Sequence, residues 1–288
     1  MMKTNIPARN NVRAAEMGAR SAATSKWMSW LARFGYAIKG VVYLIIGALA
    51  IQIAIGSSHA PADQQGALQT IYGQPFGKTI LLIVAIGLFA FALWSFIQAI
   101  FDTEGYGKDA KGIISRLGYA ATGIGYTGVG IGAYHLATGT GGAGKSLTAT
   151  ARDGTATLLQ HSYGVAVVVI IGLIVIGIAV FLLIKAYQGK FRRHLNLTTV
   201  SFRLRNFLVG LGRFGYAAMG IVYGIIGIFL VLAALQHNPG KAKGLDTAFL
   251  ELARQPFGTF LLAIVALGFI AYGVYSFVEA RYRRVGRG

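Results

Sequence analysis

A glycine-rich segment near the middle of the chain has the spacing of a phosphate-binding loop. Residues 139–146 read Gly-Thr-Gly-Gly-Ala-Gly-Lys-Ser and match the pattern G-x-x-x-x-G-K-S/T, in which backbone N–H groups and the Lys ammonium surround nucleotide phosphates. That chemistry requires a strand that delivers the loop to a helix N-terminus. Here a long apolar segment precedes the loop, so we interpret it as a flexible connection and predict no bound cofactor.

Side chains that could bind a metal or attack a substrate are few and scattered. The chain has five His and no Cys, and no His has the short spacing from other ligands that a metal site needs. No Ser-His-Asp set, carboxylate pair or Cys nucleophile can be assembled. We therefore predict no catalytic residue, no metal and no enzymatic activity. His135 is the one His that we treat as a candidate functional residue, because it is an ionisable group near the outer end of the third span.

The composition of the chain is that of a membrane protein, so membrane helices must position the candidate residues. Asp, Glu, Lys and Arg make up 12% of the 288 residues, about half the roughly 25% of a soluble globular protein. Apolar and aromatic residues make up 55% of the chain. This excludes a soluble two-domain enzyme and a disordered chain, and the lack of Cys excludes a disulfide-stapled secreted module. We therefore expect the lipid bilayer as a partner of the chain.

Six segments are long enough to cross a hydrocarbon core about 30 Å thick, which takes about 20 residues of helix. We expect helices because the bilayer offers no hydrogen-bond partners to an open strand. The predicted fold class is an all-α membrane protein with six transmembrane helices. The expected spans are 34–56, 79–101, 117–138, 163–187, 212–235 and 257–279.

The distribution of Lys and Arg predicts the orientation. With six spans, 21 of these residues lie on the side of the two termini and 6 on the opposite side. Cationic loops stay in the cytoplasm, so both termini are expected on the cytoplasmic side of the plasma membrane. The net charge of +18 also favours anionic lipid headgroups on the cytoplasmic side. Nucleic acid is not an expected partner, because the basic residues follow no recognisable nucleic-acid-binding fold.

The chain repeats one helix pair three times. Arg33, Arg116 and Arg213 each begin the pattern Arg-x-Gly-Tyr-Ala at the start of an odd-numbered span. We divide the chain into a cytoplasmic basic tail (1–30) and repeats at 31–104, 114–190 and 211–284. The repeats run in the same direction, which predicts pseudo-threefold symmetry about an axis along the membrane normal.

Small residues recur at intervals of seven after each of these Arg residues. Seven residues turn a helix by about 700°, close to two full turns, so they form a nearly straight stripe. Small residues let membrane helices approach closely, and helix packing is the function we predict for the stripe. Its members are Gly40, Gly47, Ala54, Gly123, Gly130, Ala137, Gly220, Gly227 and Ala234.

The second helix of each repeat has its own signature. Gln-Pro-Phe-Gly occurs at 74–77 and 255–258, and the middle repeat has His-Ser-Tyr-Gly at 161–164 instead. We place each Pro in the first turn of the helix that follows. A short outer helix is expected before each motif, with Asp63, Asp153 and Asp246 as N-caps.

These motifs together resemble a bacterial membrane family catalogued as domain of unknown function 1206. The resemblance covers about 31–284 and rests on the Arg-x-Gly-Tyr-Ala-x-x-Gly-x-x-Tyr opening and on Gln-Pro-Phe-Gly. It implies three tandem two-helix units, six spans and cytoplasmic termini, and it implies no established activity.

Two functions fit the sequence. In the first, the protein is a compact bundle closed by its Gly stripes, which acts as a structural or interaction component for an unknown membrane partner. In the second, it is a small-solute or anion channel or transporter along the pseudo-threefold axis, with Arg33, Arg116 and Arg213 as a ring at the cytoplasmic mouth. The lining would come from Tyr36, Tyr43, Tyr119, Tyr126, Tyr216 and Tyr223. Inward-facing glycines that close the axis favour the bundle, and a continuous wet cavity favours the channel.

Few other polar groups lie within the spans. Gln98, Lys185 and Glu279 occupy equivalent places near the cytoplasmic ends of the second helices. Lys185 and Glu279 could pair across repeats, but we favour the interpretation that both extend separately to the headgroups.

Overall fold

A computed structural model describes residues 26–57, 61–103, 107, 109–142, 144–189, 191–192, 195–196 and 200–283. The long helices are α2 (Lys26–Ala54), α4 (Gly77–Phe101), α5 (Ala110–Thr138), α7 (Gly164–Gln188), α8 (Phe202–Leu235) and α10 (Gly258–Tyr282). Between them lie α3 (Gln64–Tyr72), α6 (Leu147–Leu159), the 3-10 turn η2 (Pro239–Lys241) and α9 (Leu245–Ala253). Most of the basic tail (1–30), together with His59 and His194, lies outside the described residues.

Five of the long helices are apolar enough to cross a membrane. They are α2, α4, α7, α8 and α10, with mean hydropathies of 2.0 to 3.5 over their most apolar stretches. The helix α5 occupies the place of the third expected span but falls below that level, because six of the residues 117–138 are Gly and several others are Thr or Tyr. The multi-pass helical character is therefore confirmed, and the sixth crossing remains a prediction.

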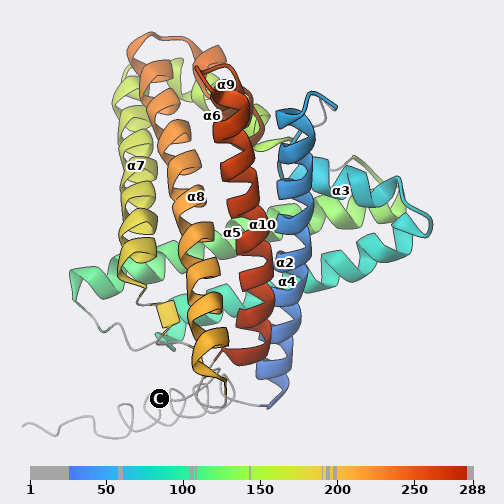
Figure 1. Cartoon of the computed structure of the whole chain (residues 1–288). Coiled ribbons are helices and arrows are strands. Elements are labelled where there is room, and N and C mark those ends of the chain that lie inside the picture. Colours follow the sequence, from blue (N-terminus) through green and yellow to red (C-terminus); the bar gives the residue numbers. More distant parts are fainter. Residues whose placement is uncertain are drawn as a thin grey trace, which may run out of the picture.

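Four helices lie side by side in the order α7, α8, α10 and α2, each packed on the next (Figure 1). The helices α4 and α5 form a pair that runs across these four in the same view, with α4 packed against α2. Helices of different repeats thus meet closely, since α10 packs on α2, α4 on α5 and α7 on α8. The pseudo-threefold arrangement of six helices remains a prediction.

A tight turn joins each short outer helix to the span that follows. Gly77 lies so close to α3 that a Cβ atom there would be 2.4 Å from the carbonyl oxygen of Tyr72. Phe76 and Phe257 adopt left-handed conformations, with φ of 61° and 58°. This backbone is rare for a residue with a side chain. Each Pro lies in the turn, two residues before its span, so our placement of Pro in the first helical turn is wrong.

The N-caps of the short helices differ from expectation in two of three cases. The Asp63 side chain accepts a hydrogen bond from the N–H of Gly66 and caps α3, as predicted. Ser146 caps α6, and Asp153 lies within that helix. Gly244 occupies the cap of α9, and Asp246 lies in its first turn, where a carboxylate still favours the positive end of the helix dipole.

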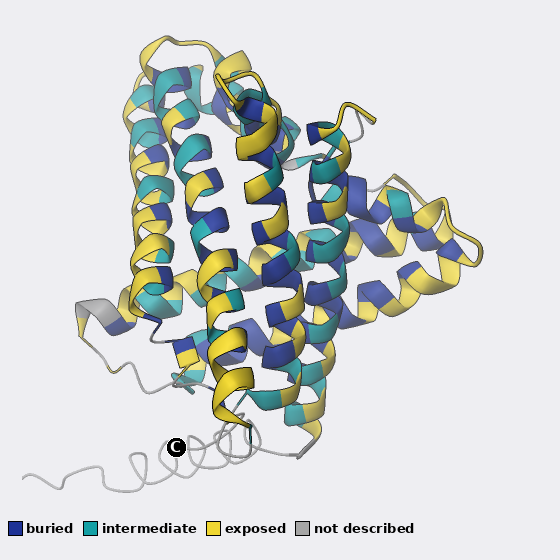
Figure 2. Ribbon diagram, viewed as in Figure 1, coloured by how far each residue is buried: buried dark blue, intermediate teal, exposed yellow. Residues whose placement is uncertain are grey.

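Buried residues concentrate where the long helices meet (Figure 2). The helix α7 is an exception, because only 17% of its most apolar stretch is buried, against 50 to 61% in the other four candidate spans. Large apolar side chains on the outer faces, such as Ile86, Leu173 and Phe260, are exposed as lipid-facing residues are.

Candidate functional site

The Gly stripes lie at contacts between helices of different repeats. A Cβ atom added to Gly40 of α2 would lie 2.9 Å from the carbonyl oxygen of Gly273 in α10. The same atom on Gly123 of α5 would lie 2.8 Å from the Phe96 ring in α4, and on Gly220 of α8 it would lie 2.8 Å from Leu183 in α7. Each stripe therefore faces the second helix of another repeat.

The contacts continue one interval further along each stripe. A Cβ atom on Gly47 would lie 2.6 Å from Ile270, on Gly130 3.0 Å from the Phe89 ring, and on Gly227 2.7 Å from Ile176. Three Ala residues continue the stripes and are buried: Ala54, Ala137 and Ala234. A larger side chain at any of these Gly positions would push two helices apart, which is the behaviour of small residues in membrane bundles.

Two of the three predicted ring arginines lie at helix C-termini. The Arg116 guanidinium donates hydrogen bonds to the carbonyl oxygens of Ala99 (2.6 Å) and Ile100 (2.9 Å), in the last turn of α4. The Arg213 guanidinium lies beside Gly189, which ends α7. Cations are favourable there because the last carbonyls form the negative end of the helix dipole. A hollow of about 400 Å³ beside Arg116 opens to the surface of α4 and α5.

The third arginine is placed differently. The Nε atom of Arg33 is buried and has no hydrogen-bond partner within the described residues. No contact recorded in that part of the chain joins Arg33 to Arg116 or Arg213.

Several of the predicted lining tyrosines instead pack against aromatic side chains between the helices. The hydroxyl oxygens of Tyr43 and Tyr126 are 3.4 Å apart, and the ring of Tyr43 meets the ring of Tyr272 edge-on at 4.8 Å. Tyr216 also meets Tyr272 edge-on, at 5.3 Å, and Tyr119 is half-buried on α5. Edge-on packing is favourable for aromatic rings and leaves little room between them.

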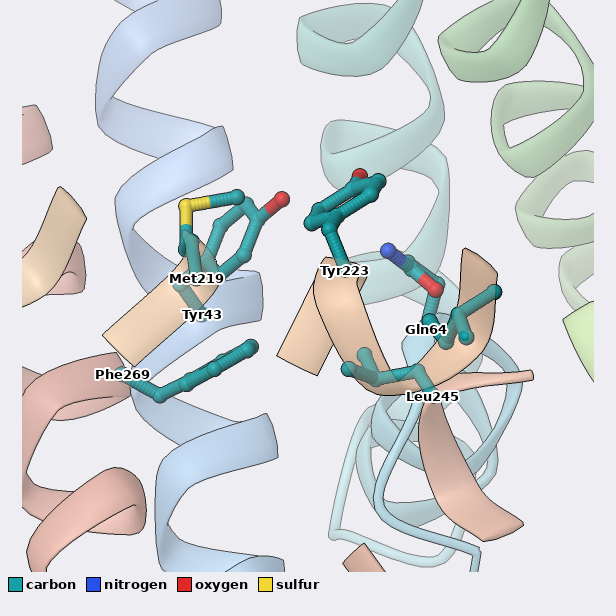
Figure 3. A pocket seen from close by; sticks show the side chains of 7 residues that line it. Tyr43, Gln64, Met219, Tyr223, Leu245 and Phe269 are labelled. Carbon is teal, nitrogen blue, oxygen red and sulfur yellow. The ribbon is translucent and has the colours of Figure 1, made fainter. Parts of the chain in front are cut away.

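Figure 3 shows the small space left beside these rings. Tyr43 and Tyr223 face one another there, with Gln64 of α3 on one side and Met219 and Phe269 on the other. The cavity has a volume of about 10 Å³, enough for about one water molecule.

A buried Lys lies next to this tyrosine cluster. The Lys39 side chain of α2 is 4% exposed, and its ammonium donates a hydrogen bond to the Tyr272 hydroxyl at 3.1 Å. The ammonium also lies 4.9 Å from the ring centres of Tyr36, Phe91 and Tyr272. Aromatic faces attract a cation most when water is excluded.

The counterion of Lys39 comes from the last helix. The ammonium is 3.4 Å from the Glu279 carboxylate of α10, and Arg283 donates to the other carboxylate oxygen at 2.6 Å. Arg283 also lies over the Tyr36 ring, at 4.8 Å. Lys185 is instead 4.2 Å from the ring centre of Tyr216. Glu279 therefore pairs with Lys39 and Arg283. The favoured interpretation, in which Glu279 extends separately to the headgroups, is wrong, and within the described residues Glu279 does not pair with Lys185.

Lys39 was not among the predicted site residues, because its charge fits the cytoplasmic excess of Lys and Arg that predicts the orientation. A signal was present in the repeats. The position six residues after each opening Arg holds Lys39 in the first repeat, Thr122 in the second and Met219 in the third. A charged side chain that lies within a span and occurs in only one of the three repeats needs a partner of its own. The partner itself could not be identified, because the sequence does not say which helices pack.

The remaining candidates carry no assembled chemistry. His135 is exposed beside Tyr134, and His161 contacts the carbonyl oxygen of Thr157. Within the described residues no three His, Asp or Glu side chains come together as metal ligands. The Gly-rich segment connects two helices, with Gly139 ending α5 and Ser146 capping α6, and its Lys145 pairs with Asp153.

Comparison with known proteins places the chain in a family. Its sequence matches the family described as Domain of Unknown Function (DUF1206) three times, at 34–102, 117–189 and 214–283. The chain belongs to the DUF1206 family. A further relative, named "Uncharacterized protein YxxB", comes from Bacillus subtilis (strain 168) and is 31% identical over 262 residues, which cover 91% of this chain and 94% of the relative. No solved structure matches the chain.

The three DUF1206 stretches coincide with the helix pairs α2–α4, α5–α7 and α8–α10. Each stretch begins directly after one of the opening Arg residues. The Lys39–Glu279 pair thus joins the first DUF1206 unit to the third. This contact has no ionic counterpart between the other units at the equivalent positions, which hold Thr122 with Gln98 and Met219 with Lys185.

Proposed function

We propose that this protein is a closed helical bundle of the bacterial plasma membrane that acts as a structural or interaction component. The observation that carries the proposal is the filled interior. Tyr43 and Tyr216, which would have to line a pore, pack edge-on against Tyr272, and the cavity beside Tyr43 and Tyr223 has a volume of about 10 Å³. A hydrated anion or small solute needs far more room than one water molecule.

The placement of the arginines supports the same function. An anion-selecting ring requires cationic side chains that face a common opening. Arg116 instead donates to carbonyl oxygens at the end of α4, and Arg213 lies at the end of α7. Their charge is directed to helix ends within the bundle.

The proposal includes six crossings with both termini in the cytoplasm. The charge count supports α5 as the sixth crossing, because an odd number of crossings would place one cationic end of the chain outside. The helix is 29 residues long, more than the about 20 residues that a crossing needs. Its glycines lower its hydropathy, and they also form its close contact with α4.

A flux assay tests the closed interior. The purified protein is reconstituted into liposomes that contain a halide-sensitive dye, and flotation confirms its insertion. We expect chloride to enter no faster than into protein-free liposomes. The triple variant Arg33→Ala, Arg116→Ala, Arg213→Ala serves as the matched comparison and should behave identically. Chloride entry through the unaltered protein would overturn the proposal, and its loss in the triple variant would establish the anion pore instead.

A further inference from the structure

The second repeat differs from the other two in how its helices pack. In the first repeat, a Cβ atom on Gly35 would lie 2.7 Å from the backbone of Phe91, so α2 and α4 are in close contact. In the third repeat, Gly215 approaches Tyr272 in the same way, also at 2.7 Å. The equivalent residues of the second repeat are Gly118 and Ile178. Gly118 has no neighbour within 4 Å, and Ile178 is 42% exposed.

The next contact along the same faces is also missing. Gly87 meets Ile38 in the first repeat, and Gly268 meets Ala218 in the third, with Cβ distances of 2.2 and 2.3 Å. The second repeat has Ile174 at the place of the two Gly residues, and this side chain is 57% exposed. Its expected counterpart Ala121 is exposed too. Both faces of the missing contact are therefore uncovered.

The uncovered faces have complementary sizes. On the α5 side the second repeat has Gly125, where the other repeats have Val42 and Val222, both fully buried. On the α7 side it has Ile174, where the other repeats have Gly. Bulk has thus moved from the first helix of the pair to the second. A volume-conserving exchange of this kind is tolerated best at a packed interface, which favours contact between an α5 face and an α7 face.

We propose that these faces meet between two copies of the chain. A twofold axis would place α5 of one copy on α7 of its partner, and α7 of the first copy on α5 of the second. The same surface is then buried twice, as in most homodimers. The partner of the bundle in the proposed function is then a second copy of the same chain, and this inference rests on that function.

Within one chain, α5 and α7 each pack on a helix of another repeat. The helix α5 is fixed to α4 through Gly123, α4 is fixed to α2 through Gly35, and α7 is fixed to α8 through Gly227, each with a Cβ distance of 2.8 Å or less. A second copy covers both faces and leaves all of them intact.

The outer segment adds another restraint on α7. The Thr148 hydroxyl of α6 accepts a hydrogen bond from the N–H of Gly244 at 2.8 Å and lies 3.0 Å from the hydroxyl of Thr247 in α9. The helix α6 leads directly into α7, so this contact ties the outer end of α7 to the third repeat. The face that carries Ile174 and Ile178 remains free for a second copy.

Disulfide trapping tests the proposal, and the absence of native Cys makes every cross-link interpretable. Two differently tagged chains are coexpressed, one with Gly118→Cys and the other with Ile178→Cys. In the first repeat, the Cβ atom of Phe91 lies 2.8 Å from the Cβ position on Gly35, so a helix contact of that kind brings two Cys within disulfide range. We expect oxidation in the membrane to give a dimer that carries both tags.

The control pair is Gly118→Cys with Leu173→Cys. Leu173 is exposed on α7, but five residues separate it from Ile178 and place it about 140° around the helix. This pair should give at most a trace of dimer. A chain carrying both Gly118→Cys and Ile178→Cys adds the decisive comparison, because an intramolecular disulfide there, with no dimer from the single variants, would overturn the proposal in favour of closure within one chain.

A second measurement avoids cross-linking altogether. Single-molecule photobleaching of the unaltered, labelled protein in lipid should show two steps for most particles, and Ala121→Trp should show one. One step for the unaltered protein would overturn the proposal. The result is independent of the flux assay. A monomer with a closed interior would overturn only the dimer proposal, and a dimer that conducts chloride would overturn only the proposed closed bundle.

Discussion

The Nζ atom of Lys39 lies 3.4 Å from the Oε2 atom of Glu279, and this ion pair joins two residues 240 positions apart in the sequence. Both side chains are about 95% buried, and α2 and α10 are both candidate membrane spans. An ion pair in such a place is not a general source of stability, because removing two charges from water is costly. It specifies which helices meet.

Replacing Glu279 with Gln should destabilise the protein markedly. The change preserves the shape of the side chain but leaves Lys39 and Arg283 without their shared anion. Breaking a buried pair on one side costs about 3 kcal/mol. We expect a clear decrease of the melting temperature in detergent, followed by size-exclusion chromatography after heating.

Glu251→Gln is the matched control. Glu251 of α9 pairs with Lys243 and Arg254 in a more exposed position, where an ion pair is worth about 1 kcal/mol or less. The double variant Lys39→Met, Glu279→Gln should recover part of the lost stability. Equal melting temperatures for Glu279→Gln and the unaltered protein would show that the pair contributes nothing.

Two glycines of the same helix should respond oppositely to Ala. In α8, a Cβ atom on Gly227 would lie 2.9 Å from the backbone nitrogen of Ile176, whereas Gly210 has no neighbour within 4 Å. Gly227→Ala should cost about 1 to 3 kcal/mol, because a packed backbone must shift. Gly210→Ala should be neutral or stabilise by up to about 1 kcal/mol through helix propensity. Thermal unfolding followed by circular dichroism measures both, and a harmless Gly227→Ala would contradict the packing function of the stripe.

Cysteine labelling should establish how many times the chain crosses the membrane. Single Cys residues are introduced at Gln69 in α3, Gly154 in α6 and Leu250 in α9, all exposed positions. We expect an impermeant maleimide to reach all three in intact cells, and to reach Trp27→Cys and Arg281→Cys only after lysis. If Gly154→Cys were labelled only from inside, α5 would not cross and the six-span topology would be wrong.

The sequence was sufficient to predict the helices and the three repeats, because both depend on local patterns, and the function of the Gly stripes in packing remains a prediction. The start of α2 at Lys26 and of α8 at Phe202 lies earlier than the expected 34 and 212. Hydropathy identifies the part of a helix that lies in lipid, and these helices extend beyond it through Lys, Arg, Leu and Met residues, which favour helix.

Contacts between repeats could not be predicted, because equivalent motifs give no indication of which copy packs on which. Gly40 could have faced α4 in its own repeat, and the structure places it on α10. The same ambiguity concealed the partner of Lys39. Exposure of Gly118 and Ile178 was also unpredictable, since Gly118 is equivalent to two buried Gly residues and Ile178 is a large apolar residue like its buried equivalents Phe91 and Tyr272.

The ion pair between α2 and α10 has a consequence for biosynthesis. The ribosome delivers α2 to the membrane long before it has made α10, so the Lys39 ammonium must wait in or near the bilayer without its carboxylate until the final helix emerges. A nascent chain that stops before Glu279 therefore retains a positive charge on its first span without the carboxylate that pairs with it in the complete protein.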